Sequence, residues 1–222
     1  MRAIALLALA FAASAAAAPG PAQFSARVNN PWFPLRPGTQ YVYGGVKDGR
    51  VARDVVTVRH AVARIDGVPC AVVDDRLYLD GRLEERTTDW YAQDRAGNVW
   101  YFGEATAELD RKGRVTSTEG SWRSGRDGAI AGIYMPAHPK VGATGRQEYL
   151  RGQAEDHFRV LDLHAAATVP YASSHDLLLT EEWTPLEPGV LDHKLYLRGV
   201  GVLLEQSAKG PNERNALVSV RR

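Results

Sequence analysis

The chain has 222 residues, with 27 Lys and Arg against 26 Asp and Glu, so its formal net charge is +1. Basic and acidic residues alternate without a basic patch or stripe, which argues against nucleic-acid binding. The single cysteine, Cys70, excludes an internal disulfide. No segment beyond the first eighteen residues is apolar enough to predict a transmembrane helix.

The first eighteen residues have the order of regions of a secretory signal peptide. Met1 and Arg2 form a short basic start, residues 4–13 an apolar run, and residues 15–18 a tract of alanines. The apolar run is shorter than the roughly 20 residues that span a bilayer. We therefore expect this leader to be removed, which leaves a soluble protein in the periplasm or the medium. Cys70 lies far from the leader, so we do not expect a lipoprotein.

After the leader, residues 1–18, we expect a flexible segment over 19–29 and a single β domain over 30–222. Turn signals, mostly Asp or Lys followed by Gly, recur about every 8–14 residues, a spacing typical of all-β domains. Gly supplies, and Asp tolerates, the positive φ that tight hairpin turns need. Composition and spacing therefore predict an all-β fold.

The clearest hairpin spans 77–84, where two alternating runs flank the turn Asp80-Gly81. A second joins residues 90–93 to 99–102. Only 104–110 suggests one or two short helical turns. The prediction is a strongly curved antiparallel sheet or partly open β-barrel of about 10–13 strands with little helix. Runs rich in Val, Leu, Tyr and Trp predict further strands at 55–58, 72–73, 158–163, 177–183, 195–204 and 217–220.

The second hairpin is dense in aromatic residues. Side chains alternate between the two faces of a strand, so Trp90 and Trp100 are expected on the face opposite to Tyr91 and Tyr101. Such a face could stack on a sugar or another flat ligand, although cross-strand packing is the commoner reason for aromatic pairs. Acidic residues in this hairpin could suggest calcium, but the EF-hand loop pattern is absent, so bonds to the local backbone are the better interpretation.

Two segments resemble known proteins. Residues 30–39, Asn-Pro-Trp-Phe-Pro-Leu-Arg-Pro-Gly-Thr, followed by Tyr-Val-Tyr at 41–43, resemble the mature start of uncharacterised exported bacterial β-sheet proteins. Residues 196–205, with Gly-Val-Gly before an apolar run that ends in Glu205, resemble a late strand of that group and of the lipoprotein-carrier half-barrels. The resemblance implies a curved antiparallel sheet with an apolar ligand cavity, and it implies no catalytic residues.

The most suggestive polar residues lie on two consecutive predicted strands. Glu181 shares one strand face with Leu177, Leu179 and Trp183, and His193 shares one face of the next strand with Leu195 and Leu197. Because a lone buried charge is costly, we expect Glu181 and His193 to meet on the concave side of the sheet. They could bind a ligand, act as an acid–base pair, or form a satisfied core ion pair.

Other candidate sites have weaker support. His157, His175 and His193 could bind zinc, but no spacing typical of a zinc site joins them. Ser174-His175-Asp176 is not a triad signature, since triads are assembled from distant segments. Cys70 lies in an apolar stretch and is interpreted as a small buried hydrophobe.

These features favour an exported binding protein without enzymatic activity, which holds an apolar, lipid-like or aromatic small ligand in a curved β-sheet cavity. A metal- or carboxylate-dependent hydrolase in the same cavity is one alternative, and a cell-envelope interaction module without a small ligand is another. No motif identifies a cofactor or fixes the oligomeric state. The predicted ligand-binding residues are Trp90, Trp100, Glu181, Trp183 and His193.

Overall fold

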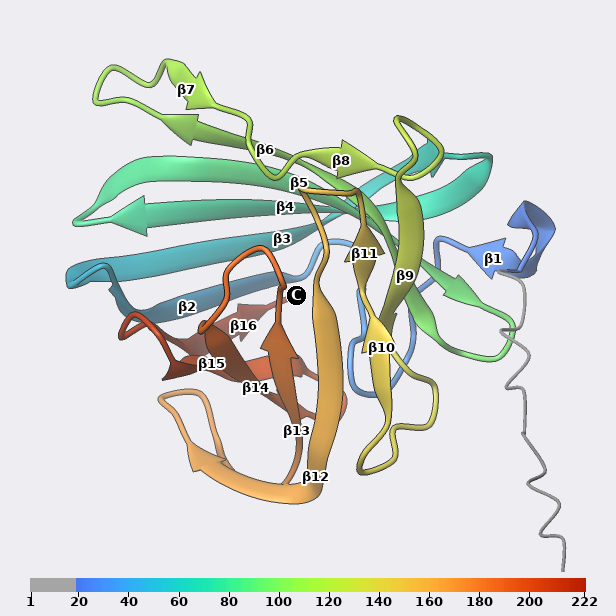
Figure 1. The fold of residues 1–222 in the computed structure, drawn as a ribbon. Helices are drawn as coiled ribbons and strands as arrows, with labels where there is room; N and C mark the ends of the chain where they lie inside the picture. The colour runs from blue at the N-terminus through green and yellow to red at the C-terminus, as the bar shows by residue number, and fades with distance from the viewer. Residues whose placement is uncertain (1–18) are drawn as a thin grey trace, which may run out of the picture.

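A computed structural model describes residues 19–222, so the predicted leader over 1–18 lies outside the described residues. Within 19–222 the only helix is the 3-10 turn η1 (Pro21–Gln23), and no helix there has the length and hydropathy of a membrane span. The strands are β1 (Phe24–Ser25), β2 (Gln40–Lys47), β3 (Arg50–Ile65), β4 (Val68–Leu79), β5 (Arg82–Asp94), β6 (Val99–Leu109), β7 (Val115–Ser117), β8 (Trp122–Arg123), β9 (Ile130–Met135), β10 (Thr144–Arg146), β11 (Glu148–Tyr149), β12 (His157–Thr168), β13 (Ser173–Trp183), β14 (Leu191–Leu197), β15 (Gly201–Lys209) and β16 (Arg214–Arg221) (Figure 1).

Thirteen of these strands form one continuous antiparallel path, in the order β10-β12-β13-β14-β15-β16-β2-β3-β4-β5-β6-β9-β11. β1 pairs with β5, and β7 and β8 pair with β6. The two end strands, β10 and β11, are separated in sequence by the single residue Gln147. The sheet therefore curls almost into a closed barrel with one seam (Figure 1), which confirms the predicted fold class.

Three two-residue turns set the register of the long β2–β5 meander. Each turn is an Asp followed by a Gly, both with positive φ: 52° and 69° at Asp48-Gly49, 48° and 78° at Asp66-Gly67, and 52° and 80° at Asp80-Gly81. Two successive residues with positive φ make the turn whose twist matches that of the flanking strands. The predicted hairpin at 77–84 is therefore confirmed, and its turn chemistry explains why consecutive strands pair.

The helical turns expected at 104–110 are not found. Residues of this segment up to Leu109 belong to β6, where Glu108 pairs with Glu85 and Ala107 with Arg86 of β5. Glu and Ala favour helix in isolation, but pairing with a long neighbouring strand overrides such weak preferences.

The segment 19–29, expected to be flexible, is attached to the barrel. Phe24 of β1 pairs with Asp94 of β5. Its ring packs edge to face on Trp100 and Phe102, with centroids 5.7 and 5.2 Å apart. Burial of this aromatic side chain offsets the entropy that a free segment would keep.

A small core lies under this segment, on the outer face of the sheet. It contains the fully buried Cys70 together with Ile65, Val68, Trp90 and Phe102. Burial raises the pKa of the Cys70 thiol to about 12, so the residue is a small hydrophobe rather than a reactive thiol, as predicted.

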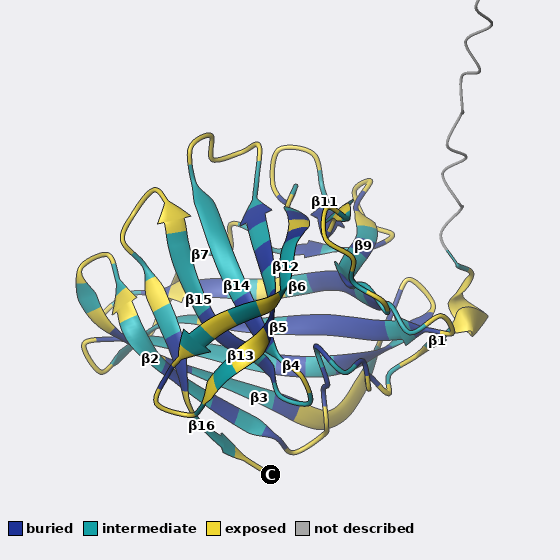
Figure 2. Ribbon diagram, turned by 90° about the horizontal axis from the view of Figure 1, so that it is seen from below, coloured by how far each residue is buried: buried dark blue, intermediate teal, exposed yellow. Residues whose placement is uncertain are grey.

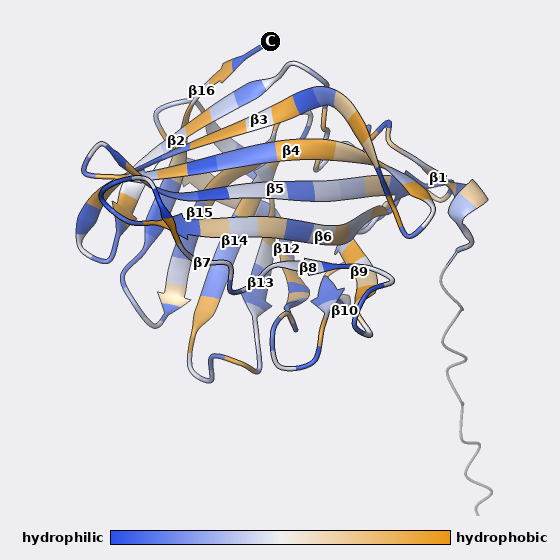
Figure 3. Ribbon diagram, turned by 90° about the horizontal axis from the view of Figure 1, so that it is seen from above, coloured by the Kyte–Doolittle hydropathy of each residue, from blue (hydrophilic) through white to orange (hydrophobic). Residues whose placement is uncertain are grey.

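The main core fills the barrel. Its buried residues come from strands at both ends of the chain, including Tyr43, Val58, Tyr196 and Leu217, and Figure 2 shows the buried segments along the middle of the long strands. Hydrophilic segments interrupt the hydrophobic ones along β3, β4 and β5 (Figure 3). Among them are Asp54, Asp75 and Asp89, which sit at positions normally occupied by apolar residues and define the candidate site.

Gly132 in β9 closes the seam of the barrel. A Cβ at this position would lie 2.2 Å from the carbonyl oxygen of Arg146 and 2.6 Å from the carbonyl carbon of Gln147. We therefore expect Gly132→Ala to lower the free energy of unfolding by about 1–3 kcal/mol, the usual cost of overpacking. Gly44→Ala is the control, because its nearest contact would be Val218 Cγ2 at 3.4 Å. Equal urea midpoints for the two variants would contradict this role for Gly132.

Candidate functional site

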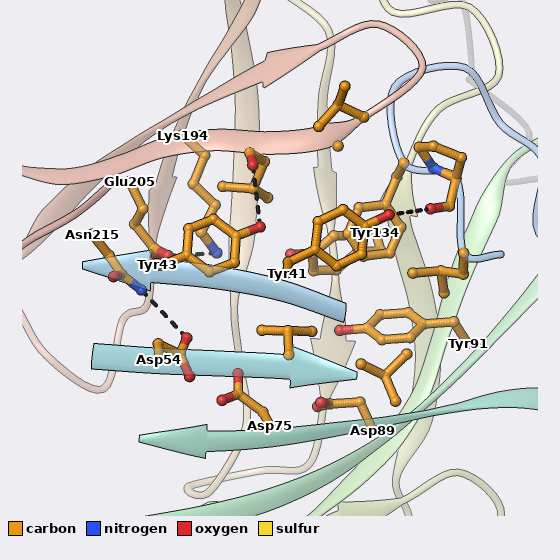
Figure 4. Close-up of a pocket in the computed structure, with 18 residues that line it drawn as sticks. Tyr41, Tyr43, Asp54, Asp75, Asp89, Tyr91, Tyr134, Lys194, Glu205 and Asn215 are labelled. Atoms are coloured by element: carbon orange, nitrogen blue, oxygen red, sulfur yellow. Dashed lines mark hydrogen bonds and ion pairs between the residues drawn. The ribbon is translucent and has the colours of Figure 1, made fainter. Parts of the chain in front are cut away.

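A cavity of about 190 Å³ lies inside the barrel. Strands β2–β5 form one wall, and β14–β16 and the loop before β2 form the other. Figure 4 shows its two ends: Tyr91 and Tyr134 lie toward one end, and Asp54, Glu205 and Asn215 toward the other. The cavity therefore has an aromatic end and an acidic end.

The aromatic end is built from rings on three separate segments. Phe33, from the loop before β2, lies 5.2 Å from Tyr91 and 4.6 Å from Tyr134, measured between ring centroids. Tyr91 and Tyr134 meet edge to face at 5.2 Å, and Tyr91 stacks on Tyr101 at 4.7 Å. Rings packed against one another in this way keep few rotamers, so this end of the cavity is a rigid apolar surface.

The tyrosine hydroxyls of the cavity differ in their partners. Tyr41 donates to the carbonyl oxygen of Pro34 at 3.2 Å, and Tyr43 donates to that of Val202 at 3.1 Å. Among residues 19–222, no hydrogen bond is found for the hydroxyls of Tyr91 and Tyr134. Burial raises the pKa of Tyr91 well above its usual value, so its hydroxyl keeps its proton and can donate it in a hydrogen bond.

The acidic end contains two carboxyl groups from adjacent strands. Asp54 on β3 is 9% exposed, and its Oδ2 accepts a hydrogen bond of 3.3 Å from Nδ2 of Asn215. Burial raises the pKa of Asp54. The pKa of Asp75 on β4 is raised well above its usual value, first by burial and then by the neighbouring Asp54. This arrangement favours one proton shared by the two carboxyl groups, because two neighbouring like charges disfavour ionisation of both.

One cation, whose side chain is 17% exposed, lies opposite this pair. Lys194 Nζ is 2.8 Å from Glu182 Oε2 and 3.3 Å from Glu205 Oε1. Tyr196 and Thr180 both donate hydrogen bonds to Glu182 Oε1, at 3.1 and 3.0 Å. Burial alone would lower the pKa of Lys194, but Glu182 and Glu205 raise it well above its usual value. Lys194 is therefore a charged ammonium already held by two carboxylates, which makes it unsuited to act as a nucleophile.

A second group of carboxyls lies on β5, β6 and β11. Tyr101 donates a hydrogen bond of 2.6 Å to Asp89 Oδ1. Asp89 faces Glu104 across the two strands. Burial raises the pKa of Asp89 to about 7, that of Glu104 to about 9 and that of Glu148 to about 8. These groups hold protons near neutral pH, which limits the charge inside the barrel.

The structure places Glu181 and His193 directly opposite each other on β13 and β14, but not on the concave side. The neighbouring residue Lys194 is the one that lines the cavity, and it pairs there with Glu182. Adjacent strand residues point to opposite faces, so Glu181 and His193 lie on the other side. Glu181 instead pairs with Arg159 at 3.2 Å, and no hydrogen bond is found between Glu181 and His193 in the described chain. The predicted pairing register is confirmed, whereas the predicted face is wrong by one residue.

The three predicted tryptophans also lie away from the cavity. Trp183 stacks on His157, with ring centroids 5.6 Å apart. Trp90 is 6% exposed in the small outer core, with the Arg123 guanidinium 4.4 Å from its ring centroid. Trp100 donates its indole N–H to Asp94 Oδ2 at 2.8 Å. Trp90 and Trp100 lie on the face opposite to Tyr91 and Tyr101, as expected, and there they pack against protein.

The remaining polar candidates are not gathered into one site. His157 interacts through Nδ1 with the carbonyl oxygen of Glu155 at 2.8 Å, while His175 is exposed on β13. Within residues 19–222 no group of three or more His, Cys, Asp or Glu side chains is arranged to hold a metal ion. Asp94 accepts a hydrogen bond of 2.9 Å from the backbone N–H of Asn98, so this carboxylate stabilises the turn in which it lies.

Sequence reasoning did not select the residues that line the cavity. Asp54 and Asp75 each stand between apolar residues at i−2 or i+2: Ala52 and Val56, and Val73 and Leu77. Glu182 and Lys194 follow Glu181 and His193 by one residue, so they lie on the strand faces opposite to those that the sequence pattern selected. A systematic search for acids in apolar alternation on successive strands could have found this set.

No protein-family model and no curated protein matches the chain. Two solved structures are similar to it over 86% of its length. One, from Bacteroides fragilis, is described as an exported protein with a YmcC-like fold; it is 13% identical, matches over 99% of its own length and gives a TM-score of 0.49. The other, from Parabacteroides distasonis, is described as a lipoprotein; it is 10% identical, matches over 98% of its length and gives a TM-score of 0.44. The similarity to lipoprotein-carrier half-barrels stays a prediction.

Proposed function

We propose that this chain is a binding protein without enzymatic activity, which holds a small molecule with an apolar or aromatic body inside its barrel. The observation that supports the proposal best is the aromatic end of the cavity, where Phe33, Tyr91 and Tyr134 form a packed surface. Small-molecule sites are typically concave, mostly apolar and largely preformed, with a few polar groups that orient the ligand. The hydroxyls of Tyr91 and Tyr134, for which no hydrogen bond is found among residues 19–222, are such groups.

The site of action belongs to the same proposal. The signal-peptide pattern of residues 1–18 favours export, and we propose that binding takes place in the periplasm or the medium.

The neutral aromatic probe N-phenyl-1-naphthylamine tests the proposal, since its fluorescence rises in an apolar site. We expect saturable binding of one probe molecule per chain. Val56 lines the cavity, so Val56→Trp should fill it and abolish the binding. Val55→Trp places the same side chain on the other face of β3 and should leave binding within about twofold of the native value.

The outcomes separate the possibilities clearly. Absence of saturable binding by the folded native chain would overturn the proposed function, and so would undiminished binding by Val56→Trp. Native mass spectrometry of the chain isolated from an exporting host gives an independent test. We expect a small organic mass bound to the protein, and a bound divalent ion instead would favour the hydrolase alternative.

A further inference from the structure

The cavity continues beyond its acidic end. A second space of about 210 Å³ adjoins it and shares Asp54, Asp75, Glu205 and Asn215 with the first. Its remaining lining includes Glu85 and Asp192 from the inside of the barrel, and residues of the β2–β3 and β15–β16 ends. The shared residues therefore form an acidic middle section between the aromatic end and the barrel mouth.

The negative groups of this section outnumber the cations that could neutralise them. Lys194 pairs with Glu182 and Glu205, and Lys47 near the mouth pairs with Glu213 at 3.8 Å. No ion pair within residues 19–222 includes Asp54 or Asp75. Buried carboxylates are normally paired with a cation or hydrogen-bonded.

Two buried polar atoms at the site have no partner in the described chain. These atoms are Asp54 Oδ1 and Asn215 Oδ1, and neither makes a hydrogen bond to residues 19–222. Both atoms accept hydrogen bonds, and neither can donate one when Asp54 is ionised. The hydroxyl of Tyr91, whose residue is 7% exposed, points into the same cavity without a partner (Figure 4). The Tyr91 hydroxyl can donate as well as accept, whereas the oxygens of Asp54 and Asn215 require a donor, and a positively charged donor forms the stronger bond.

We infer that the ligand is an amphipathic amine, with its ammonium group between Asp54 and Asp75 and its apolar or aromatic body against Phe33, Tyr91 and Tyr134. The inference rests on the proposed function and narrows its ligand class. An ammonium supplies three donors, and it is attracted to the faces of the surrounding tyrosine rings. A carboxylate ligand would meet Asp54, Asp75 and Glu205. Lys194 is already paired with two glutamates, Lys47 pairs with Glu213, and Arg214 is exposed at the mouth of the adjoining space.

The ammonium also changes the protonation of the pair. A nearby positive charge favours the ionised form of a carboxyl group. The proton shared by Asp54 and Asp75 would then leave to solvent as the amine binds. Tyr43, Glu205 and Asn215 face the pair from β2, β15 and β16. None of these three carries a positive charge, so the ligand ammonium would supply the missing cation.

Two matched sets of probes test the inference by isothermal titration calorimetry. The first set is 2-phenylethylamine, 2-phenylethanol and 3-phenylpropionate; the second is hexylamine, hexanol and hexanoate. In at least one set we expect the amine to bind about tenfold or more tightly than the alcohol, and the carboxylate to bind weakest. Equal affinities of amine and alcohol would overturn the inference and leave the proposed function standing. A carboxylate that binds more tightly than the amine of its set would also overturn the inference.

Variants locate the ammonium. Asp54→Asn and Asp75→Asn should each weaken amine binding about tenfold, with alcohol binding within about twofold of the native value. The unchanged alcohol affinity shows that the cavity is intact. Asp48→Asn, at the exposed β2–β3 turn, is the matched control and should change neither affinity. If both variants bind the amine as the native chain does, the inference is wrong. If the native chain binds no compound of either set and also fails to bind the naphthylamine probe, the proposed function falls as well.

Discussion

Replacement of Lys194 by methionine should lower the free energy of unfolding by about 3–5 kcal/mol, the usual result of removing one partner from a buried ion pair. The ammonium of Lys194 is the shared partner of Glu182 and Glu205, at 2.8 and 3.3 Å. Methionine keeps the length and much of the volume of the side chain but supplies no charge. Glu182 would then stay buried with only the hydroxyls of Tyr196 and Thr180 as partners.

Lys47→Met is the matched control for this measurement. Lys47 also pairs with a glutamate, Glu213, but the two side chains are 42% and 34% exposed. Exposed ion pairs contribute about 0–1 kcal/mol, so the control should shift the urea midpoint little. If the two variants lose the same free energy, the ion pairs of Lys194 with the buried Glu182 and with Glu205, whose side chain is 40% exposed, do not stabilise the barrel as inferred.

The free energy of unfolding should fall as the pH rises from about 5 to 9, which is opposite in sign to ordinary acid denaturation. Burial raises the pKa of Asp89 to about 7, of Glu148 to about 8 and of Glu104 to about 9. In the unfolded chain the pKa of such carboxyls is about 4. Between these limits the folded chain binds protons that the unfolded chain has lost, so each rise in pH favours unfolding.

The contribution of these groups to the free energy of unfolding is fully present below about pH 4, and it is lost as the pH rises through their folded-state pKa values. One group in this window costs about 1.4 kcal/mol per pH unit. Because neighbouring carboxyls interact, we expect a combined loss of at least about 3 kcal/mol between pH 5 and pH 9. Urea unfolding at pH 5, 7 and 9 measures it.

Glu104→Gln identifies the source of the effect. The amide keeps the shape of the side chain but cannot ionise, so the fall in stability with pH should become shallower, and at pH 9 the variant should be more stable than the native chain. Glu119→Gln removes a glutamate that is exposed in the loop after β7 and should leave the pH profile unchanged. Parallel profiles for the native chain and Glu104→Gln would show that Glu104 does not carry the predicted proton.

Local chemistry made much of the fold predictable from the sequence. The Asp-Gly pairs at 48–49, 66–67 and 80–81 provide the positive φ of two-residue turns, so the β2–β5 meander follows from neighbouring residues alone. The opposite placement of Trp90 and Tyr91 follows from the period of two along a strand. The pairing of Glu181 with His193 follows from the short connection between their strands. The conformation of residues 104–110 does not follow from their own preferences, because pairing with β5, which lies outside that segment, decides it.

The sequence by itself determined the all-β class, the hairpin turns and which residues share a strand face, because these depend on contacts of short range. Only the tertiary structure decided which face is inside. Leu177 and Leu178 are both fully buried, so hydrophobicity cannot choose the phase of β13, and an error of one residue exchanges Glu181 for Glu182. The acidic end of the cavity likewise depends on the pairing of the last strand, β16, with β2, which brings Asn215 beside Asp54 of β3 across 161 positions of the chain. No local pattern encodes that proximity, because it depends on pairing between strands that are distant in the sequence.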